Sequence, residues 1–96
     1  MVIEVLTFRL GHDRDDTAFL DADSRVQAEF VYRQPGVVRR TTARSGDGEW
    51  LVVTLWETTD DAIAADGRAA ADPAASEFMA FVDEATVRTA RYTTRD

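Results

Sequence analysis

Ninety-six residues are enough for one domain with one hydrophobic core and too few for two. The chain has 18 acidic residues against 11 basic ones, all of them Arg, and its formal net charge of -7 disfavours binding to the phosphates of nucleic acids. It has no Cys, which excludes disulfides, iron–sulfur clusters and Cys nucleophiles and fits a reducing cytoplasm, and no apolar stretch approaches the roughly 18 residues of a membrane span. We therefore expect a single cytoplasmic domain over residues 1–96, without a nucleic-acid or membrane partner.

The first predicted strand runs from Val2 to Leu10, because this stretch is rich in β-branched and aromatic residues and ends at Gly11. Alternate side chains of a strand point to opposite faces. One face then carries Val2, Leu6, Phe8 and Leu10, and the other carries Ile3, Val5 and Thr7. Both faces are largely apolar, so neither is expected to face water.

The next loop holds the only His of the chain, His12, close to Asp13, Asp15 and Asp16. A single His excludes a metal site built from several imidazoles and leaves one imidazole for acid–base work. One interpretation is a solvated loop residue beside a helix-capping acidic cluster, and the other is a base at the mouth of a pocket. The spacing of His12 and these Asp residues matches no known ligand pattern, so we predict no metal site.

A helix is predicted after this loop, with Asp15 or Asp16 as its cap. Its apolar stripe has spacings of three, four and four and consists of Phe19, Ala22, Val26 and Phe30. The helix should end before Pro35, which disfavours helical geometry in the preceding residue, and Gly36 should open a turn.

Two strands joined around Ser45–Gly48 should follow as a hairpin. The second of them is apolar on both faces, with Trp50, Val52, Thr54 and Trp56 on one side and Leu51, Val53 and Leu55 on the other. A two- or four-residue loop places Arg39 on the face of Thr54 or Trp56, with Arg40 on the opposite face. A three-residue loop exchanges the two Arg residues.

Whichever Arg points inward needs an anionic partner. The pair can simply carry the charges that protect an edge strand from aberrant pairing. Alternatively, Arg39 binds the carboxylate or enolate of a ligand.

In the second half of the chain, Thr58 followed by Asp61 resembles a capping box and starts an Ala-rich helix. This helix should break near Asp72 and Pro73, where Asp72 can cap a second piece with Pro73 in its first turn. Phe78, Met79 and Val82 supply the buried stripe of that piece, and Ala85 to Arg95 alternates like a final strand.

The resulting order, β-α-β-β-α-β, predicts an α+β, ferredoxin-like subunit: a four-stranded antiparallel sheet with both helices on one face. The other face carries Leu51, Val53 and Leu55, and an exposed apolar patch of this kind usually marks an association site. We therefore predict a homodimer in which two sheets pack face to face.

The pattern PGVVRR, a hairpin, LWETTDDA, an Ala-rich helix and a terminal strand together resemble the dimeric α/β-barrel superfamily, and within it the antibiotic-biosynthesis-monooxygenase type of domain. Pro35-Gly36 and Trp56 are the most specific parts of the resemblance. It implies a ferredoxin-like subunit whose sheet pairs with another to form a barrel. It also implies one of several activities, because the superfamily includes cofactor-independent oxygenases of polyketide-like aromatics, haem-degrading enzymes and proteins without a known activity.

The haem-degrading members resemble the chain at Trp56, but they use a His on the following helix as the iron ligand. The corresponding stretch here, AIAADGRAA, has Asp66 and Arg68 and no His. We therefore predict no cofactor.

Trp50 and Trp56 are either core residues or part of a pocket. In the second interpretation the pocket lies between sheet and helices and is lined by Trp56, Phe30, Phe78 and Met79, with Thr54 as a hydroxyl donor. Aromatic walls with few polar groups suit a small aromatic ligand.

Two functions remain open. One is a cofactor-independent monooxygenase-like enzyme in which Arg39, with His12 as a further candidate, polarises an aromatic or polyketide-like substrate held against Trp56. The other is a non-catalytic dimer with a metabolite-binding, structural or stress-related role. The catalytic residues themselves stay unknown at this point.

Overall fold

The computed structural model describes residues 1–95. Its elements in chain order are β1 (Val2–Phe8), α1 (Asp16–Glu29), the 3-10 turn η1 (Val31–Arg33), β2 (Val37–Arg44), β3 (Trp50–Trp56), α2 (Thr59–Ala69), α3 (Pro73–Met79), the 3-10 turn η2 (Glu84–Thr86) and β4 (Arg88–Thr93). The expected break divides the second helical segment into α2 and α3.

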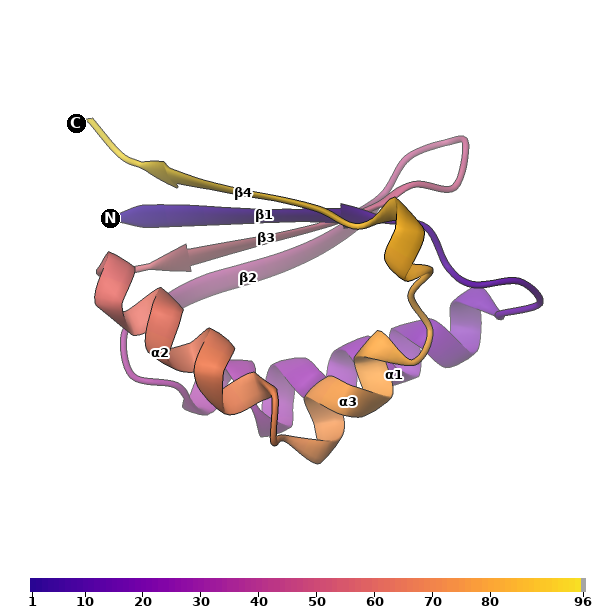
Figure 1. Cartoon of the computed structure of the whole chain (residues 1–96), viewed down its shortest axis with the longest axis horizontal. Coiled ribbons are helices and arrows are strands. Elements are labelled where there is room, and N and C mark those ends of the chain that lie inside the picture. Colours follow the sequence, from indigo (N-terminus) through magenta and orange to yellow (C-terminus); the bar gives the residue numbers. More distant parts are fainter. Residues whose placement is uncertain (96) are drawn as a thin grey trace.

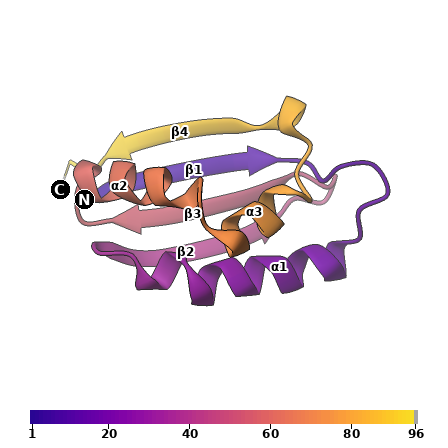
Figure 2. The same ribbon diagram turned by 60° about the horizontal axis from the view of Figure 1, so that its bottom comes forward.

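The four strands form one antiparallel sheet in the order β2-β3-β1-β4. Helices α1, α2 and α3 all lie on the same side of this sheet, which we call its inner face (Figure 1). The turned view shows α1 running along β2, while α2 and α3 cross in front of the other strands (Figure 2). The predicted α+β, ferredoxin-like fold is therefore confirmed.

Each helix begins at the side chain that the sequence predicts as its cap. Oxygen atoms of Asp15, Thr58 and Asp72 accept the backbone N–H three residues further on, at 3.0, 3.1 and 2.9 Å. These bonds satisfy N–H groups that have no partner within the helix.

The turn at Gly36 has a specific steric requirement. Its φ is +82°, a conformation that residues with a side chain rarely adopt, and a Cβ atom there would lie 2.1 Å from Asp61 Oδ2. The turn between η1 and β2 thus packs directly against the first turn of α2, which explains why Gly follows Pro35.

The core consists of two separate clusters of buried side chains. The larger one is aromatic and includes Phe8, Phe19, Trp50 and Phe78, with the rings of Phe19 and Trp50 4.8 Å apart. The predicted stripe of α1 belongs to it, apart from Ala22, which is itself fully buried. The smaller cluster consists of Val2, Trp56, Ala62 and Ala65.

The hairpin loop decides which Arg lies inside. The backbone N–H of Ser45 donates to the carbonyl of Glu49 at 2.8 Å, so the loop proper has three residues, Gly46–Gly48. Arg40 consequently lies opposite Thr54 on the inner face, and Arg39 lies opposite Leu55 on the other face. The assignment of Arg39 to the inside is therefore wrong, because the alternative with a three-residue loop is the one that the chain adopts.

Three strand boundaries and one burial prediction also differ. The first strand stops at Phe8, and the last runs from Arg88 to Thr93. The last strand begins late because Asp83 caps the short turn η2 by accepting the N–H of Ala85 at 3.1 Å. In the predicted stripe of the last helix, Phe78 and Val82 are buried, whereas Met79 is 39% exposed.

The face of the sheet without helices, its outer face, is apolar at the centre. Its central side chains are partly exposed and comprise Ile3, Val5, Leu51, Val53 and Leu55. Polar and charged residues such as Arg39, Thr41 and Arg88 lie on the two flanking strands. Over residues 1–95, no helix has both the length and the apolar character needed to cross a membrane.

Candidate functional site

A cavity of about 530 Å³ opens between the inner face of the sheet and the helices. This size falls within the range of roughly 300–1,000 Å³ that is typical of small-molecule sites. Residues of both core clusters line it, including Val26, Phe30, Val52 and Phe78 from the larger and Trp56 and Ala65 from the smaller. The core is divided in two because this space lies between its parts.

One wall of the cavity contains a buried hydrogen-bond donor without a partner. Trp56 is 4% exposed, and its indole Nε1 is the one buried side-chain nitrogen or oxygen of residues 1–95 that makes no hydrogen bond. A buried donor left unsatisfied costs about 1–3 kcal/mol, and native proteins usually provide a partner. An acceptor atom on a bound ligand would provide it.

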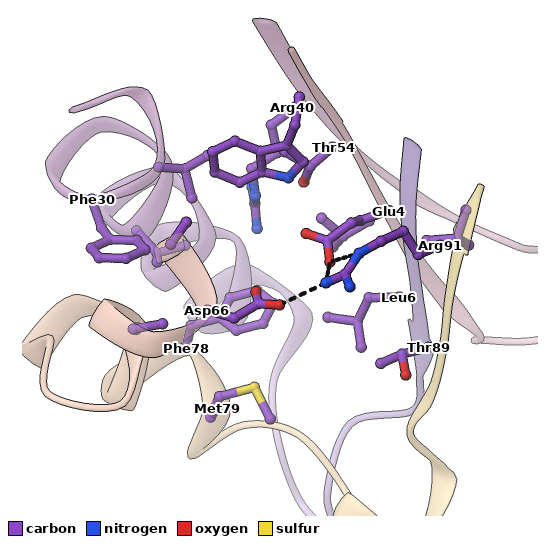
Figure 3. A pocket seen from close by; sticks show the side chains of 18 of the residues that line it. Glu4, Leu6, Phe30, Arg40, Thr54, Asp66, Phe78, Met79, Thr89 and Arg91 are labelled. Carbon is purple, nitrogen blue, oxygen red and sulfur yellow. Dashed lines mark hydrogen bonds and ion pairs between the residues drawn. The ribbon is translucent and has the colours of Figure 1, made fainter. Parts of the chain in front are cut away.

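Three charged side chains from different elements meet at one side of the cavity (Figure 3). Nη2 of Arg91 donates to Glu4 Oε2 at 2.6 Å and to Asp66 Oδ2 at 3.2 Å, and Arg91 Nε also reaches Glu4 Oε2 at 3.2 Å. The sheet register puts Glu4 directly opposite Arg91, while α2 supplies Asp66. One guanidinium group therefore holds two carboxylates.

The surroundings of Asp66 alter its acidity. Burial raises the pKa of Asp66, and the charge and hydrogen bonding of Glu4 raise it further, while the charge of Arg91 partly offsets them. Asp66 is nonetheless 63% exposed at its side chain, so solvent reaches this carboxyl. A carboxylate with a raised pKa at the edge of a cavity is a suitable proton acceptor.

A second ion pair lies deeper inside. Arg40 Nη2 donates to Asp23 Oδ1 at 2.8 Å, and the two side chains are only 4% and 10% exposed. Arg40 Nη1 donates to Gln27 and to Thr42, both at 3.2 Å. The guanidinium also lies 5.6 Å from the centre of the Phe78 ring, so both of its terminal nitrogens and one face have partners within the protein.

The structure brings five of the seven predicted site residues together. Trp56, Thr54, Phe30, Phe78 and Met79 all line the cavity, and their role as ligand contacts stays a prediction.

Arg39 and His12 lie elsewhere. Arg39 is on the outer face, opposite Leu55, and Arg40 takes the inner position. His12 is in the loop after β1, with 95% of its side chain exposed and Nε2 3.2 Å from Asp13. Over residues 1–95, no three His, Asp or Glu side chains are grouped so that they could hold a metal ion.

The predicted site lacked Glu4, Asp66 and Arg91 of the cavity and the buried Asp23 behind it, although the sequence carried a signal for two of them. Glu4 falls on the otherwise apolar inner face of β1, between Val2 and Leu6. Asp23 lies on the buried side of α1, four residues after Phe19 and three before Val26. A charged residue at a position that periodicity assigns to the interior indicates an ion pair or a binding site.

No protein-family model and no curated protein sequence matches the chain. Solved structures do. The cofactor-independent oxygenase SnoaB from Streptomyces nogalater is 26% identical with a TM-score of 0.81, and the match covers 99% of this chain and 93% of that one. A protein from Bordetella bronchiseptica, described as a candidate antibiotic biosynthesis monooxygenase, is 15% identical with a TM-score of 0.81 over 98% of this chain and 96% of that one.

A third structure, a mutant of MhuD with two manganese protoporphyrin IX molecules in each active site, is 16% identical with a TM-score of 0.67, covering 98% of this chain and 94% of that one. At this identity the likeness concerns the fold. The fold, the sequence features around Trp56 and the similarity to SnoaB agree with one another. The chain has the fold of the antibiotic-biosynthesis-monooxygenase type of domain and is similar over nearly its whole length to one cofactor-independent oxygenase of that type.

Proposed function

We propose that the protein is a cofactor-independent monooxygenase-like enzyme that oxidises an aromatic, polyketide-like small molecule. The observation that carries this proposal is the cavity beside Trp56, whose walls are mostly apolar and whose buried indole N–H has no partner. The similarity to the cofactor-independent oxygenase SnoaB supports it.

The chemistry requires a substrate that can become an electron-rich anion. In an anthrone, a CH₂ group lies between two aromatic rings opposite a carbonyl group. Loss of one proton from this carbon gives an anion whose charge spreads to the carbonyl oxygen. The carbon then adds O₂ and, after protonation, becomes a hydroperoxide. Elimination of water leaves a new carbonyl group, so that CH₂ and O₂ become C=O and H₂O.

The residues of the cavity fit these steps. Trp56 Nε1–H can donate to the oxygen that bears the anionic charge, which stabilises the anion. Phe30 and Phe78 hold the aromatic rings. The carboxylates of Asp66 and Glu4 can accept the carbon-bound proton and return it when the hydroperoxide loses water.

The first prediction concerns turnover. With 1,8-dihydroxyanthrone (dithranol) as the probe, the protein is expected to accelerate formation of 1,8-dihydroxyanthraquinone (danthron) in proportion to its concentration. One O₂ should be consumed for each dithranol. An oxygen electrode and the absorbance of danthron measure both quantities, with a chelator present and the spontaneous oxidation in buffer subtracted. A rate equal to that of buffer would contradict the enzymatic proposal.

A non-catalytic binder is the second candidate. It is favoured by the engagement of both cavity carboxylates with Arg91, because oxygens that would have to accept a substrate proton already accept hydrogen bonds from the guanidinium. Tight binding of danthron without any turnover of dithranol would support this candidate over the enzyme.

We further propose that a second copy of the chain covers the outer face. The apolar centre of this face has no helix over it (Figure 1). Polar residues such as Arg39, Thr41 and Arg88 lie on the flanking strands, as in an interface with an apolar core and a polar rim. Two such faces related by a two-fold axis would cover each other.

The second prediction follows from this dimer. Val53→Asp puts a carboxylate at the centre of the outer face and should weaken self-association by at least about 100-fold, because an unpaired charge would be buried. Sedimentation should show twice the 10.7 kDa chain mass for the original protein and the single mass for the variant. Thr41→Asp on the flanking strand β2 is the control and should remain dimeric. A single mass for the original protein at micromolar concentration would refute the dimer.

We also propose that the protein works in the cytoplasm. The absence of Cys supports this location, because disulfides do not persist in a reducing compartment and proteins there do not depend on them. Fractionation of cells that express the protein tests it.

A further inference from the structure

We propose that Glu4 and Asp66 make the cavity selective for uncharged hydroxyaromatic ligands and exclude ligands that carry a carboxylate. This inference rests on the proposed function, since it concerns the same cavity, and it specifies the class of substrate.

The charge of Arg91, one of the two cations that line the cavity, is already neutralised. Arg91 binds Glu4 through two nitrogens, at 2.6 and 3.2 Å, and Asp66 through one, at 3.2 Å. Because two carboxylates share one guanidinium, this group of three has a formal charge of -1. A third carboxylate brought by a ligand would therefore be repelled.

Arg40, the other cation that lines the cavity, also has its partners within the protein. Its guanidinium is bound by Asp23, Gln27 and Thr42 and is buried. A ligand carboxylate could reach it only by displacing Asp23, which would leave the Asp23 carboxylate buried without a partner. Neither guanidinium is thus free to hold an anionic ligand. The two acids and two Arg that line the cavity balance each other, and Asp23, which pairs with Arg40 behind the wall, gives the whole group an excess of one negative charge.

The acidity of Asp66 also indicates that a ligand carboxylate is disfavoured in the cavity. Its pKa is raised by burial and by the neighbouring charge of Glu4, despite the presence of Arg91. A ligand carboxylate in the cavity would meet the same desolvation and the same repulsion.

The groups that remain available suit an uncharged ligand with polar substituents. Trp56 Nε1–H offers a donor to a carbonyl oxygen. The carboxylate oxygens of Glu4 and Asp66 are acceptors for phenolic O–H groups, and Thr54 adds a hydroxyl on the same side of the sheet (Figure 3). The flat rings of a hydroxyaromatic fit between the apolar walls.

Two commercial compounds that differ by one carboxylate provide the test. Danthron is an uncharged dihydroxyanthraquinone, and rhein is the same ring system with a carboxylate. Isothermal titration at pH 7 and low salt should show rhein binding at least about 10-fold more weakly, as expected for one charge near another at an intermediate dielectric constant. Added salt should reduce this difference, because it screens the repulsion.

Variants of the two carboxylates identify the cause. Glu4→Gln and Asp66→Asn each remove the excess charge, so the ratio of the rhein and danthron dissociation constants should fall several-fold in each. Asp13→Asn is the matched control, because Asp13 lies in the exposed loop after β1 and does not line the cavity, and it should leave the ratio unchanged.

The outcomes separate this inference from the proposed function. Equal or tighter binding of rhein, or an unchanged ratio in Glu4→Gln and Asp66→Asn, would overturn the charge selectivity while the aromatic site stands. Failure of both compounds to bind would overturn the proposed function and the selectivity with it.

Discussion

Replacing Arg40 by Met is expected to lower the free energy of unfolding by about 3–5 kcal/mol, because it removes one partner of a buried ion pair. Asp23 would then keep a charge in surroundings where only 10% of its side chain is exposed, and Thr42 would be its remaining hydrogen-bond donor at 3.0 Å. Unfolding by urea, followed by circular dichroism, measures the loss.

Two further variants test whether the loss of stability comes from the burial of the ion pair. Arg44→Met removes an Arg from the same face of β2, but that Arg is 42% exposed and pairs with Asp16 at the surface, so the expected loss is below about 1 kcal/mol. The double variant Asp23→Leu with Arg40→Met should recover most of the stability, since apolar residues can replace a buried pair. A single Arg40→Met variant as stable as the Arg44→Met variant would show that the buried pair contributes little.

Replacing Trp56 by Phe is expected to reduce dithranol turnover by about 10- to 100-fold, since a hydrogen bond to a charged group contributes about 1.5–3 kcal/mol. Phe keeps an aromatic ring in the wall, but it removes the indole N–H that has no partner within the protein together with part of the ring system. The loss should therefore appear in kcat, with a smaller change in KM, because the oxygen gains its charge in the reaction.

Trp50→Phe is the matched control for this experiment. Trp50 is on the same face of the same strand and is equally buried, at 4% exposure, but it packs in the larger core cluster and does not line the cavity. Its replacement should cost stability and leave turnover close to the original. Equal loss of turnover in the two variants would mean that Trp56 acts through packing and not through its N–H.

The fold could be predicted from the sequence because its signals are local and consistent with one another. The stripe of α1, the caps at Asp15, Thr58 and Asp72, and the break at Pro73 each depend on a few neighbouring residues, and all of them appear in the structure. The aromatic side of the cavity followed from the same alternation, which puts Trp56 and Thr54 on one face of β3.

The charged side of the cavity could not be predicted in the same way. Its ion pairs join residues that are far apart in the sequence, and the periodicity of a helix or strand does not say which of them meet. Whether Arg39 or Arg40 points inward depends on whether the hairpin loop has an odd or an even number of residues, and the sequence around Gly46 permits both. The pairing of Glu4 with Arg91 joins residues at opposite ends of the chain.

The division of the core affects how proteins with this fold can evolve. Phe8, Phe19 and Trp50 of the larger core cluster do not line the cavity, whereas residues outside both clusters, such as Met79 and Ala69, do. Replacements at the border of the cavity can reshape the ligand space while the aromatic scaffold persists, so new substrate preferences need not compromise folding. Such a separation of roles is consistent with the retention of this architecture in proteins that share as little as 10% of their residues with the chain.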